Sequence, residues 1–192
     1  PIGDPTRSTA ALQLAEAHKH LGNISAAQAA IEQAQLAAIT DADWAAALAA
    51  LGGMTSGMGD YTGAQAILEE AVALARASEN SLTLCRVLYA LGSQYWRLGK
   101  MDRVHALMTE SLTLARALGN AQRELYALNA LATVAWLQNE AEAEHNFQSI
   151  YRQAVAVGDR LSAVTALNNL GVMADDRQDY QAARDYFQQA LT

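Results

Sequence analysis

The chain has 192 residues, a net charge of −7, and a composition that is 52% hydrophobic but only 6% aromatic. Much of the difference is alanine, the strongest helix former, and both prolines fall within the first five residues, so none interrupts a later helix. The acidic balance argues against general nucleic-acid binding. No apolar run is long enough to span a membrane, and no signal-peptide pattern opens the chain. We therefore expect an all-α, cytoplasmic protein.

Taken in chain order, one short pattern recurs along the sequence. It consists of two large residues three positions apart, followed by a small residue. The strong copies are Leu48-x-x-Leu51-Gly52, Leu88-x-x-Leu91-Gly92, Leu128-x-x-Leu131-Ala132 and Leu167-x-x-Leu170-Gly171, and a weaker one is Ala11-x-x-Leu14-Ala15. We call the second large residue of each copy the landmark leucine. It recurs every 39 or 40 residues from Leu51 onward. Fixed-period self-similarity of this kind is typical of repeat architectures.

Each copy continues with a small residue and, four positions later, a large apolar one. These pairs are Ala27/Ile31, Ala64/Leu68, Val104/Met108, Ala143/Phe147 and Ala183/Phe187. The pair at Ala143 comes one residue early, which predicts that the first helix of that repeat has lost one residue after Trp136. Gly-Asn and Gly-Asp steps between the halves indicate helix C-caps followed by N-caps. The small residues after the landmark leucines are expected to let the two helices of a hairpin approach closely.

These spacings predict ten helices and one repeat domain over residues 1–192. The helices are expected at 7–21, 24–38, 41–57, 61–77, 80–98, 101–118, 120–137, 140–157, 159–176 and 180–192, which pair into five repeats over 7–38, 41–77, 80–118, 120–157 and 159–192. Since the chain starts without Met and stops inside a helical pattern, we interpret it as a segment of a longer protein.

The pattern resembles the tetratricopeptide repeat, whose signature is large-x-x-Leu-Gly-x-x-Tyr followed by Ala-x-x-x-Phe. Leu88-x-x-Leu91-Gly92-x-x-Tyr95 matches the first half, and Ala183-x-x-x-Phe187 matches the second. The repeat is longer than the usual ~34 residues and lacks the closing proline. This long form is similar to the arrays of MalT-like bacterial regulators, which are signal-transducing ATPases, and to those of peptide-binding polarity adaptors. The resemblance implies a right-handed α-solenoid whose first helices line a concave groove.

By the same resemblance, positions −5, −2, +2, +5 and +6 from the landmark leucine face the groove. We predict that a partner binds there through the third and fourth repeats, with one contact from the fifth. The residues are Arg86, Tyr89, Ser93, Trp96, Arg97, Tyr126, Asn129, Thr133, Trp136 and Asn168. Trp, Tyr and Arg carry much of the binding energy in known interfaces. The alternative is that Trp96 and Trp136 pack between adjacent hairpins.

Charge and catalytic motifs narrow the expected function. Seven basic and three acidic residues lie between Arg76 and Arg123, so the middle of an acidic chain is basic and suits an acidic partner. We interpret the four histidines as solvated, Cys85 as buried and unreactive, and the Glu140–Glu144 carboxylates as a solvated first turn. We expect no catalytic site, no metal and no cofactor. The predicted function is a protein-, peptide- or small-effector-binding sensor segment of a bacterial regulator that self-associates through its terminal repeat; the alternative is a stand-alone peptide-binding adaptor.

Overall fold

The computed structural model describes residues 4–139 and 141–191, and every regular element in these ranges is an α-helix. The helices are α1 (Pro5–His20), α2 (Ile24–Ala37), α3 (Asp41–Gly57), α4 (Tyr61–Ala77), α5 (Ser81–Arg97), α6 (Met101–Ala117), α7 (Ala121–Leu137), α8 (Ala143–Val157), α9 (Arg160–Asp176) and α10 (Tyr180–Ala190). The predicted all-α class and helix–turn–helix repeats are confirmed. Positions 140 and 192, where two helices were predicted to begin and end, lie outside the described residues.

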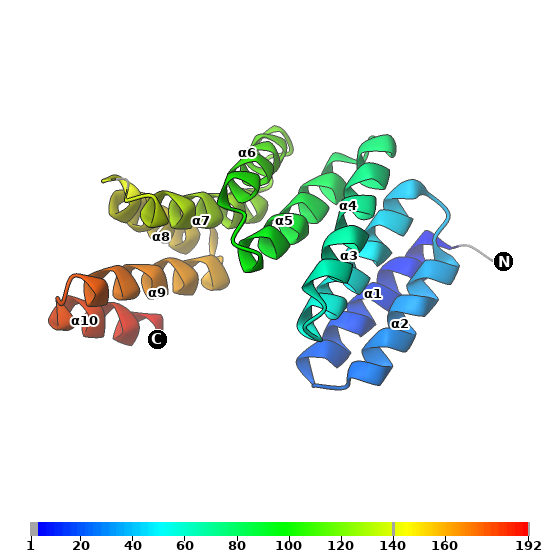
Figure 1. Ribbon diagram of the computed structural model, residues 1–192, viewed down its shortest axis with the longest axis horizontal. Helices are drawn as coiled ribbons and strands as arrows, with labels where there is room; N and C mark the ends of the chain where they lie inside the picture. Colours follow the sequence, from blue (N-terminus) through cyan, green and yellow to red (C-terminus); the bar gives the residue numbers. More distant parts are fainter. Residues whose placement is uncertain (1–3, 140, 192) are drawn as a thin grey trace. The chain divides into compact units, whose positions relative to one another are not determined.

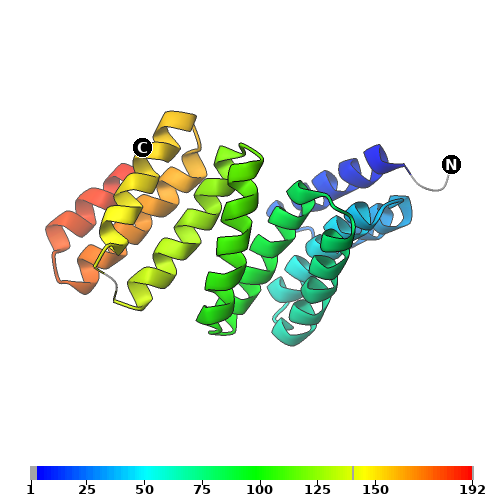
Figure 2. The same ribbon diagram turned by 90° about the horizontal axis from the view of Figure 1, so that it is seen from above.

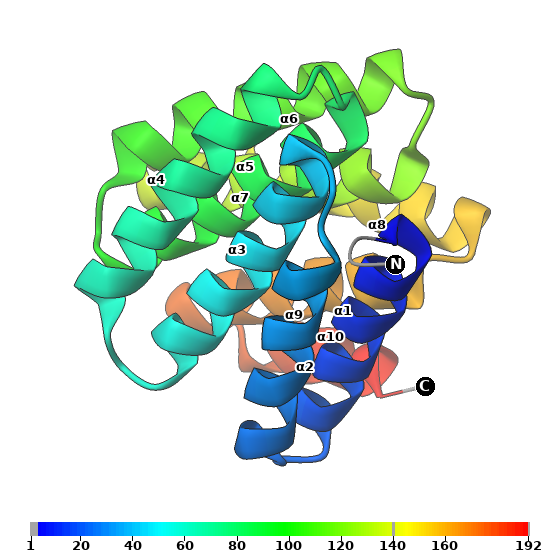
Figure 3. The same ribbon diagram turned by 90° about the vertical axis from the view of Figure 1, so that its right-hand side faces the viewer.

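The helices form two compact units, Pro1–Lys100 with α1 to α5 and Met101–Thr192 with α6 to α10. In the first unit, α1 pairs with α2 and α3 with α4, and α4 also packs against α5 (Figure 1). In this unit, α3 lies beside both α1 and α5 (Figure 3). In the second unit, each helix packs against the next, and α7 lies beside α9 (Figure 2). Each unit therefore places first helices of successive repeats side by side.

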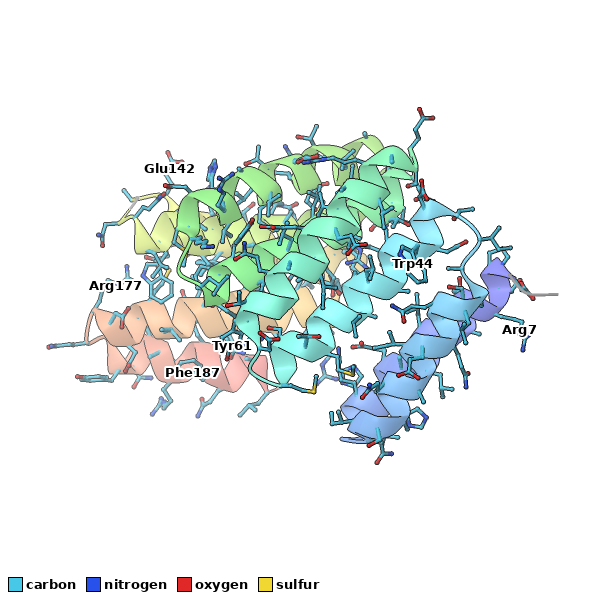
Figure 4. The ribbon with its side chains drawn as sticks, turned by 45° about the vertical axis from the view of Figure 1, so that its right-hand side comes forward. Arg7, Trp44, Tyr61, Glu142, Arg177 and Phe187 are labelled. Atoms are coloured by element: carbon cyan, nitrogen blue, oxygen red, sulfur yellow. The ribbon has the colours of Figure 1, made fainter. Side chains whose placement is uncertain are left out.

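Two glycines after landmark leucines lie where paired helices approach most closely. A Cβ atom added at Gly52 on α3 would lie 2.6 Å from Leu68 Cγ on α4. One added at Gly171 on α9 would lie 2.5 Å from Cε1 of Phe187, which extends from α10 (Figure 4). Both distances are shorter than van der Waals contact, so these helix pairs need glycine there. This confirms the predicted reason for the small residues at these two positions.

The turns within hairpins show where the fourth repeat is shortened. The φ angle of Asn139 is 58°, in the left-handed region that Gly22, Gly59 and Gly99 occupy in other hairpins. Asn139 therefore belongs to the turn after α7, and α8 starts at Ala143 and not at residue 140 as the sequence pattern predicted. Because α7 and α5 have the same 17-residue length, the expected loss from the first helix is wrong. The shortening lies after Asn139 and reaches α8, which starts at Ala143 without a side-chain cap.

Each unit has a core of buried apolar side chains. The core of the second unit surrounds the fully buried ring of Phe147 and includes Leu125, Ile150 and Leu170. In the first unit, small clusters dominated by alanine join α1, α2 and α3. Since an alanine side chain is short, these helices pack closely, and the apolar area buried per residue is modest.

Candidate functional site

The third-repeat residues predicted for the groove share one face of α5. At about 100° per helical residue, the five predicted positions span about 100° of the helix surface. Arg86, Ser93, Trp96 and Arg97 are exposed, and Tyr89 is half-buried. Trp96 is 36% exposed, so its indole combines partial burial with a contact surface. The face carries two arginines and no carboxylate.

A buried polar network lies beside the predicted face, about 110° around α5 from the centre of that face. Gln94 is 2% exposed, and its Nε2 donates to the backbone oxygen of Tyr61 at 2.7 Å. Ser56 Oγ on α3 donates to Gln94 Oε1 at 2.6 Å. Since a buried amide without partners costs free energy, these two bonds fix Gln94 between α3 and the start of α4. The network therefore fixes the rotation of α5 and the direction in which Trp96 and Arg97 project.

This network was missed at the sequence level, although a signal was present. The position three residues after the landmark leucine is Met54, Gln94, Val134 and Met173 in four successive repeats. A single glutamine in an otherwise apolar column indicates a buried amide that needs partners. The sequence gives no sign that those partners are a serine on α3 and a backbone carbonyl.

A second set of contacts joins α5 to α4. The Tyr95 hydroxyl donates to Glu69 Oε1 at 2.6 Å. Lys100 Nζ donates to Gln65 Oε1 at 2.9 Å and lies 5.4 Å from the centroid of the Tyr95 ring. These contacts pair Tyr95 and Lys100 with α4. The cations at the predicted positions of α5 are Arg86 and Arg97.

Beside α5, the corresponding face of α3 is lined with small residues. The predicted positions there are Ala46, Ala49, Gly53, Ser56 and Gly57, and added Cβ atoms at Gly53 and Gly57 would meet nothing within 4 Å. On α1 the same positions are Thr9, Leu12, Glu16, Lys19 and His20. On this face of the first unit, the small side chains of α3 therefore leave its backbone accessible between the larger side chains of α5 and α1.

In the second unit, the predicted α7 residues lie on one face but are more buried. Asn129 is 7% exposed; its Nδ2 donates to the Leu125 oxygen at 3.2 Å. Asn129 Oδ1 is buried and has no hydrogen-bond partner among the described residues. Thr133 Oγ1 donates to the Asn129 backbone oxygen at 2.7 Å. Asn168, at the equivalent position of the neighbouring α9, is exposed.

The aromatic residues of α7 have structural contacts of their own. Trp136 is half-buried and packs against the core cluster around Phe147. Tyr126 is half-buried, and the Arg123 guanidinium lies 5.4 Å from its ring centroid. The packing alternative thus has direct support for Trp136, while Trp96 retains more accessible surface. The binding role of both residues stays a prediction.

The predicted binding face of the second unit, formed by α7 and α9, is acidic at the end of α9. Asp175 and Asp176 end α9 and are exposed. Arg177, in the turn that follows, donates from Nη1 to Glu144 Oε2 on α8 at 2.6 Å (Figure 4). This hydrogen bond raises the pKa of the Arg177 guanidinium above its usual value. Arg177 is thereby paired, whereas the two aspartates leave the end of α9 acidic.

The remaining candidate residues are the cysteine and the four histidines. Cys85 is completely buried, as predicted. His20, His105 and His145 are exposed, but His18 is half-buried with its Nδ1 inaccessible, so the solvated interpretation is wrong for that residue. Within residues 4–139 and 141–191, no group of three or more His, Cys, Asp or Glu residues could hold a metal ion. None of the described helices is long and apolar enough to cross a membrane.

Several solved structures are similar to this chain in fold. One is a kinesin light chain from Podosopora anserina, whose TPR-like repeats are nearly identical to one another. It aligns at 16% identity with a TM-score of 0.69, over 97% of this chain and 94% of the other. BtubC from P. vanneervenii aligns at 18% identity with a TM-score of 0.65, over 97% and 71%. At these identities, the likeness concerns the fold alone.

A third similar structure belongs to a much larger protein. It is a signal transduction ATPase with numerous domains (STAND) with a tetratricopeptide repeat sensor, from Pyrococcus horikoshii. The identity is 12% and the TM-score 0.78, and the alignment covers 95% of this chain but only 28% of that one. No curated protein matches this chain in sequence.

The family itself is established by the sequence match. The model of the tetratricopeptide repeat family matches residues 43–117 and 123–192, which together make up most of the chain. The matched segments contain the landmark leucines from Leu51 to Leu170 and the glycine contacts of α3 and α9. The chain belongs to the tetratricopeptide repeat family.

Proposed function

We propose that this chain is a non-catalytic scaffold that binds a protein or peptide on the faces of its first helices. The observation that carries the proposal is the exposed face of α5, where Trp96 lies among Arg86, Ser93 and Arg97. An aromatic ring with neighbouring arginines is the kind of surface that carries binding energy. Tetratricopeptide repeats commonly bind proteins, and the family match supports this class of function.

The charge of α5 favours an acidic partner. Arg86 and Arg97 project from a helix that has no acidic residue, within a chain whose net charge is −7. Carboxylates placed near these guanidiniums would form charge-assisted hydrogen bonds. Such exposed pairs are screened by salt, so we expect the affinity to fall as the ionic strength rises.

The second unit offers a different kind of contact, suited to a peptide backbone. Asn129 and Asn168 hold the same repeat position on neighbouring helices, and a side-chain amide both donates and accepts. Packed helices lie about 8–10 Å apart, and an extended peptide advances about 3.3 Å per residue. The two asparagines would therefore contact peptide groups about three residues apart.

The binding proposal is tested by selecting peptides from a random displayed library on the purified chain. We expect acidic, extended sequences to be enriched and to bind more weakly to Arg97→Glu. The charge-matched control is Arg103→Glu, an exposed residue of α6 outside the predicted face. Equal affinity of both variants and the parent would remove the acidic-partner proposal.

A separate substitution distinguishes binding from packing. Trp96→Ala should cost about 2 kcal/mol or more in binding if the indole is a hot spot. Thermal unfolding provides the control. If Trp96→Ala lowers Tm sharply while affinity for the selected peptide is unchanged, Trp96 is a packing residue.

For the biological setting, we propose a cytoplasmic sensor segment of a larger bacterial regulator. The similarity to a repeat sensor in a STAND protein supports this setting, since sensor arrays there form part of a longer chain. A small effector is then a further possible ligand. The second candidate is a stand-alone peptide-binding adaptor, which the kinesin light chain likeness favours. Full-length sequencing distinguishes them: an ATPase domain or a DNA-binding helix-turn-helix in the same polypeptide supports the regulator.

A further inference from the structure

A cavity of about 270 Å³ lies in the second unit, between α6, α7 and α8. Leu128, Leu131, Ala132 and Ala135 line it from α7, together with Gln138 beyond the end of that helix. His105 contributes from α6, and Asn146, Ser149, Ile150 and Gln153 contribute from α8. All ten residues belong to one compact unit, so the cavity is a property of that unit.

The sequence of the fourth repeat explains why α7 and α8 leave space here. The residue after the landmark leucine is Ala132, where two other repeats have the contact glycines Gly52 and Gly171. The alanine methyl occupies the space that those glycines leave open to the opposing Leu68 or Phe187. In addition, α8 starts late and without a side-chain cap. Ala132 lines the cavity, which ties the opening to this local departure from the repeat.

The cavity and the proposed peptide face lie on opposite sides of α7. The lining positions are −3, 0, +1, +4 and +7 from Leu131, whereas the predicted groove positions on this helix are −5, −2, +2 and +5. With about 100° per residue, the centres of the two sets are separated by roughly 150°. The cavity is therefore a site distinct from the proposed peptide face.

The lining combines apolar side chains with a polar rim whose described residues include no carboxylate, lysine or arginine. Leucine, isoleucine and alanine side chains provide the base, of which Ala132 and Ile150 are almost fully buried. The rim carries amides, a hydroxyl and an imidazole, and Gln153 Nε2 donates to Ser149 Oγ at 3.1 Å. None of the described lining residues is Asp, Glu, Lys or Arg. A charged ligand would lose hydration here without gaining a counter-charge.

We propose that the cavity between α6, α7 and α8 binds a small uncharged amphipathic molecule. Its apolar part lies against Leu128, Leu131 and Ile150, and its hydrogen-bonding part contacts the amide and imidazole rim at His105 and Asn146. The volume is slightly below the usual range for drug-sized ligands, ~300–1,000 Å³. The ligand class is thus a compact neutral amide, lactam or ester with one branched alkyl group.

The probe is N-acetyl-L-leucine methylamide, which has an isobutyl group and two uncharged amides. A titration followed by amide chemical shifts of the ¹⁵N-labelled chain should show saturable binding with a Kd on the order of 1 mM, as expected for a fragment. The shifts should centre on Leu131, Ala135, Asn146 and Ser149. N-acetyl-L-leucine, which has a carboxylate in place of the second amide, should bind at least tenfold more weakly.

Two matched pairs of variants assign the site. His105→Ala removes a rim hydrogen bond and should weaken binding roughly threefold to tenfold, whereas His145→Ala, an exposed histidine outside the lining, should not change it. Ser149→Leu fills the cavity and should abolish saturable binding, whereas Gln148→Leu on the adjacent position should preserve it. The histidine pair is exposed, so that test does not depend on the filled variant folding.

Four results would overturn the proposal. The first is unchanged binding to Ser149→Leu that has a native circular dichroism spectrum. The second is shift changes centred on Asn168 and Thr133, which would place the probe on the peptide face. The third is equal affinity for the carboxylate analogue. The fourth is an equal loss of affinity in both histidine variants. Any of these leaves the proposed peptide-binding function intact, since that function rests on other faces of α5, α7 and α9.

Discussion

Two adjacent glycines of α3 perform different roles. Gly52 lies against the buried Leu68 side chain, and an added Cβ atom would lie 2.6 Å from Leu68 Cγ. Gly53 is exposed, and its added Cβ atom would meet nothing within 4 Å. We therefore predict that Gly52→Ala destabilises the chain by about 1–3 kcal/mol through overpacking. Gly53→Ala should instead stabilise it by up to about 1 kcal/mol, because alanine favours the helix.

Urea unfolding of the two variants measures this difference in sign. Each variant adds one methyl group to the same helix, so Gly53→Ala is a direct control for Gly52→Ala. A stabilising Gly52→Ala would show that α3 and α4 can separate at no cost. The close approach of these helices would then not depend on glycine.

A second prediction for single residues concerns turn positions with a positive φ angle. Gln178 has a φ of 62° in the turn between α9 and α10, where a side chain is unfavourable. Gln178→Gly should raise the free energy of unfolding by about 0.5–1 kcal/mol. Gly158 has a φ of 73°, so Gly158→Ala should lower it by a similar amount. Thermal melts of both variants check the prediction, and an unchanged or lower Tm for Gln178→Gly would contradict it.

At the scale of elements, the buried amide of Gln94 determines how α5 is oriented. Gln94→Leu leaves Ser56 Oγ and the Tyr61 carbonyl without their bonding partner. The Ser56 residue is buried, and an unsatisfied buried group costs about 1–3 kcal/mol, so we expect a loss of about that size. The same variant should weaken binding of a selected peptide because Trp96 and Arg97 project from the same helix.

A double-mutant cycle with Ser56→Ala isolates the bond between the two side chains. We expect a coupling energy of about 1 kcal/mol in equilibrium unfolding. Strict additivity of the two substitutions would show that the 2.6 Å contact contributes nothing to stability. The orientation of α5 would then have to come from apolar packing alone.

How well the sequence predicts the structure also differs between elements. Helix bounds were predictable because the caps and the three-and-four apolar spacing are local. The role of Asn139 was not, since asparagine serves both as an N-cap and as a left-handed residue after a helix. Likewise, offsets from the landmark leucine identified the exposed face of α5. They could not show that Asn129 is buried and Trp136 half-buried, because burial depends on how neighbouring helices pack.

At the scale of the whole molecule, the last helix has an apolar stripe that is open to solvent. Tyr180, Phe187 and Leu191 are 66%, 38% and 84% exposed. Their spacings of seven and four place them within about 20° of one line along a helix. Exposed apolar surface of this kind marks interaction sites. We therefore predict that the chain self-associates through α10 as its concentration rises.

Sedimentation velocity across a concentration series measures this self-association, and Tyr180→Lys combined with Leu191→Lys should shift the distribution toward monomer. Gln181→Lys combined with Gln188→Lys adds the same charge to exposed positions about 80–100° away from the stripe, and should leave association unchanged. A parent chain that stays monomeric at high concentration, or a control pair that dissociates equally, would show that the stripe does not mediate association.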